Sequence, residues 1–257
     1  MKYLQPNITN EEFVDRLKKS IESNMPLSFS RFGDGEIYFI NGNVPAKVVD
    51  NYLRIMYKYT DIGIGKRDIL GIIETAISET DVIGIMDKNN EISKRIPYSK
   101  SKWSIKSDYV NRLRNGKELI IADHMIARGQ AMGDINNFKD VIRGKGVAII
   151  SPHAQLLKQN NIQKLLDAEV NFIETQMDMK FRDRKNMLLR FDEIKEPIVL
   201  YGCSFMGKDF SVHLRDRGKI ALDFGSTLDA WAGLLTKRWF KKGGLQDYCL
   251  IENANGS

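Results

Sequence analysis

The residues best suited to chemistry stand in the stretch S-F-S-R-F-G-D-G-E, which ends at Glu36. Asp34 and Glu36 are two positions apart, so both carboxylates can aim oxygens at one point, and such oxygens suit a hard divalent cation, Mn²⁺ or Mg²⁺. Gly33 and Gly35 let the backbone turn through angles that other residues resist. Arg31 adds a planar fork of N–H donors for phosphate oxygens. The stretch predicts a loop that holds a metal and a diphosphate together.

Short apolar runs with polar or glycine ends predict the strands that position these groups. They cover residues 27–32, 82–86, 118–122, 146–150, 169–173, 197–202 and 219–224. Helical periodicity predicts helices between the runs, among them 10–24, 69–78, 101–113 and 154–159. Thr9 and Glu12 form a capping-box pattern at the start of the first helix. Alternating strands and helices predict an α/β fold, a Rossmann-like and mainly parallel sheet with helices on both faces.

Ligands of an open parallel sheet bind beyond the carboxyl ends of its strands, which narrows the choice of site residues. The candidates for catalysis, as a base or a diphosphate contact, are Asp123, His124, His153 and Asp223. The candidates for contact with a bound phosphate or sugar are Arg31, Gly33, Gly35, Ser151, Gly202, Ser204 and Ser226. The turns at Gly202 and Gly225 precede predicted helices, whose exposed N–H groups favour anions.

Other patterns argue against competing chemistries. The segment Gly202–Gly207 reads G-C-S-F-M-G, which lacks the Gly-Lys-Ser/Thr ending of a phosphate loop and the three glycines of a dinucleotide site, so a plain tight turn is the alternative. The chain has three histidines without a pair at metal-ligand spacing, which argues against zinc. Cys203 has no partner in the sequence that would make it a nucleophile, and a small buried residue is expected there.

Length and composition predict one domain over residues 1–257, because 257 residues with 42% hydrophobic side chains can bury a sizeable core. Lys and Arg number 39 against 33 Asp and Glu, and the two signs are interspersed, which predicts no nucleic-acid surface. Two cysteines indicate a reducing compartment, and without a signal pattern or a bilayer-length apolar run we expect a cytoplasmic protein. Residues 231–242 mix aromatic and basic side chains, so they either touch an anionic membrane or pack a terminal helix on the sheet.

Two motifs together resemble one family. S-F-S-R-F-G-D-G-E and the later D-F-G-S-T-L-D-A-W-A-G are similar to the glycosyltransferases of the GT-D fold type, first described as a domain of unknown function and found in bacterial protein and surface-polysaccharide glycosylation. The similarity in order of elements runs from about Leu27 to Gly233. It implies a single Rossmann-like domain, a nucleotide-sugar donor such as UDP-glucose, and a D-x-E motif that helps bind a divalent metal and the donor diphosphate.

Carried onto this chain, the resemblance makes Asp34 and Glu36 the metal-binding residues and Arg31 a neighbouring donor contact. The family's late motif often reads aspartate, any residue, glycine, histidine, whereas this chain has Ser226 at the histidine position. A serine supplies only a hydroxyl hydrogen bond in place of an ionisable ring. The role of that histidine is therefore not carried over.

These observations predict a metal-dependent glycosyltransferase that moves a hexose from a nucleotide sugar, UDP-glucose or a related UDP-sugar, to a glycan or glycoprotein. A cation and Arg31 would stabilise the charge that develops on the nucleoside-diphosphate leaving group. Two alternatives remain: a metal-dependent phosphoryl-transfer or hydrolytic enzyme that uses the same carboxylates, and a non-catalytic nucleotide- or polyanion-binding protein. The sequence does not predict the sugar, the acceptor, the stereochemical outcome or the oligomeric state.

Overall fold

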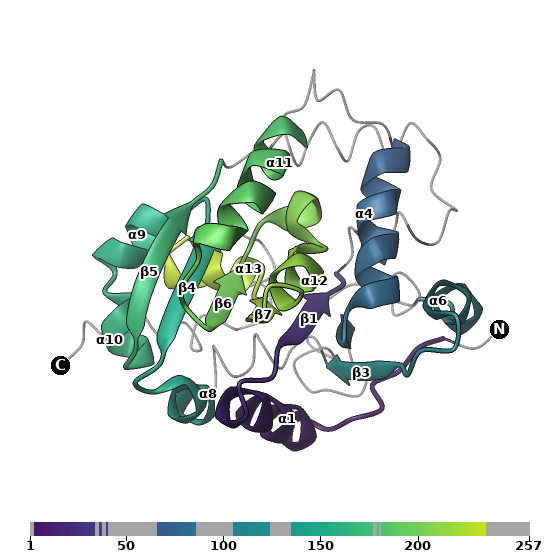
Figure 1. Cartoon of the computed structure of the whole chain (residues 1–257), viewed down its shortest axis with the longest axis horizontal. Coiled ribbons are helices and arrows are strands. Elements are labelled where there is room, and N and C mark those ends of the chain that lie inside the picture. The colour runs from purple at the N-terminus through teal and green to yellow at the C-terminus, as the bar shows by residue number, and fades with distance from the viewer. Residues whose placement is uncertain are drawn as a thin grey trace.

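A parallel β-sheet organises the chain (Figure 1). The structure, a computed structural model, describes residues 3–33, 36–37, 40, 66–85, 105–123, 135–176, 179 and 181–234. Seven strands lie in the order β3-β2-β1-β7-β6-β4-β5, and each neighbouring pair is parallel. Their bounds are β1 Leu27–Arg31, β2 Val82–Ile85, β3 Ile120–Asp123, β4 Gly146–Ser151, β5 Glu169–Glu174, β6 Ile198–Tyr201 and β7 Ile220–Asp223. The predicted α/β fold with a parallel sheet is confirmed.

Helices cover both faces of this sheet. One hydrophobic cluster joins it to α1 (Asn10–Glu22), α8 (Ile135–Ile142), α9 (Ala154–Gln159), α10 (Ile162–Leu166) and α13 (Ser226–Trp231). On the other face, two clusters join it to α4 (Lys66–Glu79), α6 (Ser107–Arg114), α11 (Phe181–Arg190) and α12 (Phe210–Arg215). Short 3₁₀ turns, η2 (Phe191–Glu193) and η3 (Ser204–Gly207), follow α11 and precede α12. Among the described helices, none is long and apolar enough to cross a membrane.

The predicted elements form with small shifts at their ends. At the start of α1 the predicted capping box is present, since Thr9 Oγ1 accepts from Glu12 N and the Glu12 carboxylate accepts from Thr9 N. The helix predicted over 101–113 instead begins at Ser107, because Lys106 pairs in an antiparallel bridge with Tyr3. Residues 101–104 and 235–257 lie outside the described part, so the single domain over 1–257 stays a prediction.

Strand β1 lies inside the sheet, between β2 and β7, and buries an apolar side chain on one face and a polar side chain on the other. Phe29 is fully buried in the cluster that contains α1. Ser30, on the opposite face, is equally buried, and its hydroxyl donates to Lys208 O at 2.9 Å and lies 2.6 Å from Ser211 Oγ. This polar contact ties β1 to the start of α12.

The boundary between β1 and β7 is a topological switch. The chain leaves β1 for α4, which packs on one face of the sheet, and leaves β7 for α13, which packs on the other. Because the two connections part in opposite directions, a crevice is expected at the carboxyl ends of β1 and β7, where ligands of open α/β sheets bind. This crevice is the place to look for a site.

Candidate active site

The centre of the crevice is a buried lysine that the sequence did not single out. Lys208 follows η3, is 2% exposed, and directs its ammonium between the ends of β1 and β7. Its Nζ lies 2.7 Å from Asp223 Oδ2, 3.2 Å from Glu36 Oε1 and 2.5 Å from the carbonyl oxygen of Arg31. Three oxygens from two strands and the following loop thus surround one positive charge.

Glu36 is held in this arrangement by both of its carboxylate oxygens. Oε2 accepts from Gly33 N at 2.8 Å, while Oε1 faces Lys208. Burial raises the pKa of Glu36, but the charges of Lys208 and Arg31 together with hydrogen bonds from the backbone of Glu36 and Gly33 more than offset burial, so its pKa lies below the ordinary value. Glu36 is therefore an ionised, enclosed carboxylate.

Arg31, at the end of β1, lies across the turn that follows β7. A Cβ built on Gly225 would stand only 2.2 Å from Nη2 of Arg31 and 2.8 Å from its Cζ. The Nε of Arg31 is buried and has no hydrogen-bond partner among the described residues. A buried guanidinium nitrogen that lacks an acceptor costs free energy, which suits a group that receives an anionic ligand.

The other described residues that were predicted to contact phosphate or sugar lie at the same edge of the sheet, and they differ in burial and in hydrogen bonding. Gly202 packs so tightly that an added Cβ would meet Gly225 O at 2.8 Å, so these two turns touch. Ser151 is fully buried and its hydroxyl accepts from His153 N at 3.1 Å. Ser226 is buried at the start of α13, whereas Ser204 is exposed with a positive φ of 54°. Beyond Gly202 the chain first forms η3, and α12 begins only at Phe210.

The described candidates for the catalytic base, Asp223, Asp123 and His153, lie in three different parts of the carboxyl edge of the sheet. Asp223 is bound by Lys208, and its Oδ2 also accepts from Arg31 N at 3.3 Å. Asp123 is buried at the end of β3, with β2 between it and β1. His153 immediately precedes α9, and its Nε2 lies 3.8 Å from Oδ1 of Asp229 on α13. His153 and Asp229 keep side-chain exposures of 11% and 19%, so solvent or a ligand can reach this pair.

Three predicted residues, Asp34, Gly35 and His124, lie outside the described part of the chain. In the described part, no three Asp, Glu, His or Cys side chains gather as a metal site. Both oxygens of Glu36 already have a partner, Gly33 N for Oε2 and Lys208 Nζ for Oε1, and its predicted role as a metal ligand stays a prediction.

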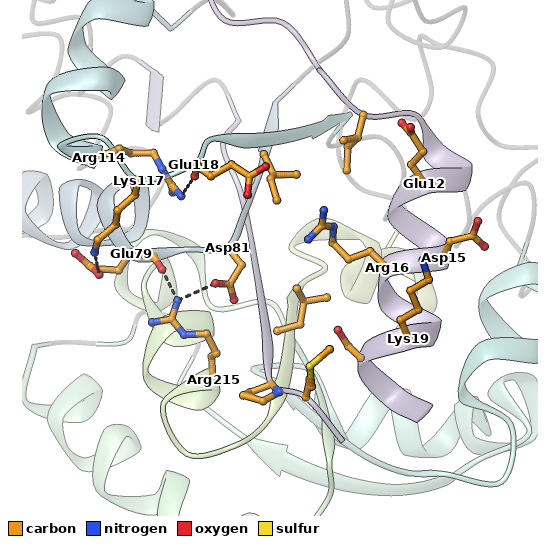
Figure 2. A pocket seen from close by; sticks show the side chains of 16 residues that line it. Glu12, Asp15, Arg16, Lys19, Glu79, Asp81, Arg114, Lys117, Glu118 and Arg215 are labelled. Carbon is orange, nitrogen blue, oxygen red and sulfur yellow. Dashed lines mark hydrogen bonds and ion pairs between the residues drawn. The ribbon is translucent and has the colours of Figure 1, made fainter. Parts of the chain in front are cut away.

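A second hollow lies at the opposite, amino edge of the sheet. This cleft, of about 930 Å³, is bounded by α1 and by the chain entering β1, β2 and β3 (Figure 2). Its charged side chains are of both signs and in part neutralise one another, as in the pairs Lys117 with Glu79 and Arg215 with Asp81. It contains none of the predicted site residues, so the crevice at the carboxyl edge is the better candidate.

Comparison with protein families and solved structures then assigns the fold. The pattern of the GT-D fold-like domain matches residues 8–231. The chain belongs to this family. The sequence-based prediction of a glycosyltransferase of the GT-D type is thereby confirmed at the level of the family. Among curated proteins, none matches the sequence significantly.

Solved structures agree with the GT-D-like assignment. A glycosyltransferase of the domain family of unknown function 1792 from Streptococcus sanguinis superposes with a TM-score of 0.60 and 16% identity, over 93% of this chain and 86% of the other. Another structure of domain of unknown function 1792, described as a distinct glycosyltransferase fold, gives a TM-score of 0.58 and 16% identity, over 93% and 82% of the two chains. At this identity the likeness shows the shared fold alone.

Two functional candidates in this GT-D-like chain escaped the sequence analysis. Lys208 directly follows the Gly202–Gly207 segment, for which a plain tight turn was the alternative, and its partners are 15 or more positions away in the sequence. Asp229 lies within α13, which begins at Ser226, and it faces His153. A lone lysine beside a glycine turn was the only signal for Lys208.

The remaining predictions concern residues without a place in the crevice. Cys203 is buried, and burial raises the pKa of its thiol to about 12, which opposes a nucleophilic role at neutral pH. His213 lies within α12 and pairs with Asp209 at 3.3 Å. Trp231 is buried against Phe224 in the core, while residues 235–242 of the proposed membrane-contacting segment lie outside the description.

Proposed function

We propose that this GT-D-like protein transfers a hexose from a nucleotide sugar, UDP-glucose or a related UDP-sugar, to a glycan or glycoprotein acceptor. The observation that carries the proposal is the guanidinium of Arg31, which lies over Gly225 with a buried Nε that has no hydrogen-bond partner among the described residues. The donor diphosphate would accept from this guanidinium. The turns at Gly202 and Gly225, which touch one another, form the facing wall.

Arg31 would contribute most while the bond between sugar and diphosphate breaks. Negative charge then develops on the leaving nucleoside diphosphate, and a prepositioned cation lowers the barrier by stabilising that charge. The backbone N–H of Arg31 donates to Asp223, and its carbonyl oxygen accepts from Lys208, so the strand end that carries the guanidinium is fixed on both sides. Such fixation reduces the reorganisation needed during the reaction.

For the base that takes the proton from the acceptor hydroxyl, the geometry favours His153 over Asp223. Asp223 is committed to Lys208 and to the backbone of Arg31. His153 keeps part of its ring exposed and has the carboxylate of Asp229 beside Nε2, which would stabilise the protonated imidazole and leave Nδ1 to accept the proton. His124 and Asp123 are the remaining predicted candidates for this step.

The predicted cofactor, Mn²⁺ or Mg²⁺, belongs to this proposal through Asp34. A metal bound there would supply further positive charge to the diphosphate. Glu36, the second predicted ligand, is engaged with Gly33 N and Lys208, so its proposed contribution is to order the loop next to Asp34.

Binding of UDP and of uridine to wild type and to Arg31→Met tests the donor site by calorimetry. If Arg31 contacts the diphosphate, wild type binds UDP, and the substitution weakens UDP binding by about 1.5–3 kcal/mol, roughly 10- to 150-fold. Uridine lacks phosphate, so its weaker binding should not change. Equal UDP binding by the folded variant and wild type would contradict this location of the donor.

The two alternative functions differ in their products. A phosphoryl-transfer or hydrolytic enzyme would cleave the nucleotide or phosphoester without a sugar acceptor. A non-catalytic binding protein would bind nucleotides or polyanions with strong salt dependence and without turnover. Identification of the products formed from a UDP-sugar therefore separates all three.

A further inference from the structure

The ammonium of Lys208 occupies a cage of oxygens of the kind that usually surrounds a metal ion. The carbonyl oxygen of Arg31, the carboxylate of Asp223 and the carboxylate of Glu36 lie at 2.5, 2.7 and 3.2 Å from Nζ. Hard divalent cations bind oxygens at roughly 2.0–2.6 Å, so the cage is only slightly too wide for one. An ammonium has three N–H donors, and this cage offers each of them an oxygen.

Charge explains why the cage needs a cation. Glu36 and Asp223 are 7% and 3% exposed, and an unpaired carboxylate at such depth is costly. Both carboxylates approach the same nitrogen, so one cation serves the two of them. The charge of Arg31 also acts on Glu36, which brings this group close to electrical balance.

The lysine is also locked in place by its own backbone. Ser30 Oγ donates to the carbonyl oxygen of Lys208 at 2.9 Å. Lys208 Nζ in turn donates to the carbonyl oxygen of Arg31, the residue that follows Ser30 in β1. The backbone and the side chain of Lys208 thus both join the segment between η3 and α12 to β1. Such a doubly anchored ammonium is a permanent part of the site.

We propose that Lys208 is a built-in cation of the crevice, which occupies the position between Glu36 and Asp223 that a divalent ion would otherwise take. In the wild-type protein these two carboxylates then do not ligate metal, and any divalent ion bound through Asp34 lies outside the cage. Removal of the ammonium converts the same carboxylates into a divalent-ion site. This inference does not rest on the proposed transferase activity, because it concerns metal binding by the protein alone.

The test is a titration of metal-free protein with Mn²⁺ in the absence of any nucleotide. The electron paramagnetic resonance signal of the free ion measures how much Mn²⁺ is bound. Lys208→Met keeps an apolar stem of similar length and removes the charge. We expect this variant to bind one Mn²⁺ at least tenfold more tightly than wild type does. In the double variant Lys208→Met/Asp223→Asn, which has one carboxylate fewer, that gain should disappear.

Arg184→Met is the matched control. Arg184 forms a buried ion pair with Asp209 at 2.5 Å. Asp209 directly follows Lys208 in the sequence, but it is not one of the three oxygen donors of the cage. Substitution of Arg184 also removes a cation that is paired with a buried carboxylate, and it should leave Mn²⁺ affinity at the wild-type level. A folded Lys208→Met variant that binds Mn²⁺ no more tightly than wild type overturns the proposal, and so does an equal gain in Arg184→Met.

Asp223→Asn in the wild-type background provides a second test if Lys208→Met does not fold. Because Lys208 already fills the cage, this substitution should change Mn²⁺ affinity less than twofold. A tenfold loss would mean that Asp223 ligates metal in the wild-type protein and would overturn the proposal. Failure of either test leaves the glycosyltransferase proposal standing, since neither uses a nucleotide sugar.

Discussion

Arg31 and Gly225 are in such close contact that residue 225 has no room for a side chain. A Cβ at this position would stand 2.2 Å from Nη2 of Arg31. The backbone of Gly225 also has a φ of 48° with a ψ of −129°, a conformation that residues with a Cβ avoid. The glycine of the late D-F-G-S motif is therefore the surface against which the guanidinium of Arg31 packs.

Gly225→Ala should weaken UDP binding about tenfold or more and lower the free energy of unfolding by about 1–3 kcal/mol. The first effect comes from displacement of Arg31 and the second from the strained backbone. Gly218→Ala is the matched control, because Gly218 also has a positive φ of 77° but has no atom within 4 Å of its built Cβ. It should lose stability in urea denaturation and keep its UDP affinity. Equal losses of UDP affinity would contradict the role of the contact.

His153→Gln should lower kcat by roughly 10²–10⁴-fold and leave UDP affinity unchanged, because a base acts on the acceptor and not on the donor. Asp229→Asn should give a smaller loss, and the double variant should be no slower than His153→Gln alone, since Asp229 acts through His153. Steady-state kinetics with calorimetry of UDP separates the two quantities. Full turnover by a folded His153→Gln protein would reassign the base to Asp123 or His124.

The low pKa of Glu36 makes the folded protein sensitive to acid. A carboxylate with a folded pKa below its unfolded value stabilises the protein fully above the unfolded value, near 4.5, and this contribution is lost as the pH falls through the folded pKa. Glu36→Gln should therefore be less stable than wild type at pH 7, and the difference should shrink below about pH 4.5. Urea denaturation from pH 7 to 3 measures it. A difference that is independent of pH would contradict an ionised Glu36 in the folded state.

Metal removal tests the part of the proposal that depends on Asp34. Treatment with EDTA should stop turnover of the UDP-sugar, and added Mn²⁺ should restore it, because the ion adds charge at the diphosphate. Asp34→Asn should require a higher Mn²⁺ concentration for half-maximal rate. Unchanged rates in EDTA would show that Arg31 and Lys208 supply the positive charge without a metal.

The sequence predicted the strands well because most of them are short apolar runs between polar ends, and burial of both faces leaves such runs few alternatives; the edge strand β5, which is mostly exposed or half-buried, is the exception. It placed Arg31, Glu36 and Asp223 at strand ends for the same reason. Strand order was not predictable, since it depends on which chain segments pack together. The contact of β1 with β7 brings Arg31 and Asp223 together across 192 positions of sequence.

Lys208 illustrates the limit of sequence reasoning about the site. Its neighbours, Gly207 and Asp209, suggest a solvated turn, and a lysine in such a setting is normally exposed. Only the approach of β1, β7 and the loop that contains Glu36 encloses its ammonium. The pair of His153 and Asp229 has the same origin, because it joins the first turn of α9 to the middle of α13.

Product analysis with UDP-sugars tests the central claim most directly. Wild type and Arg31→Met are incubated with a panel of UDP-sugars, Mn²⁺ and candidate glycan acceptors, and UDP and the fate of the sugar are quantified. We predict that wild type releases UDP with an equal amount of sugar bound to an acceptor, and that folded Arg31→Met loses most of this activity. UDP release by the variant at the wild-type rate, or formation of UMP and sugar phosphate in place of UDP, would contradict hexose transfer at this crevice.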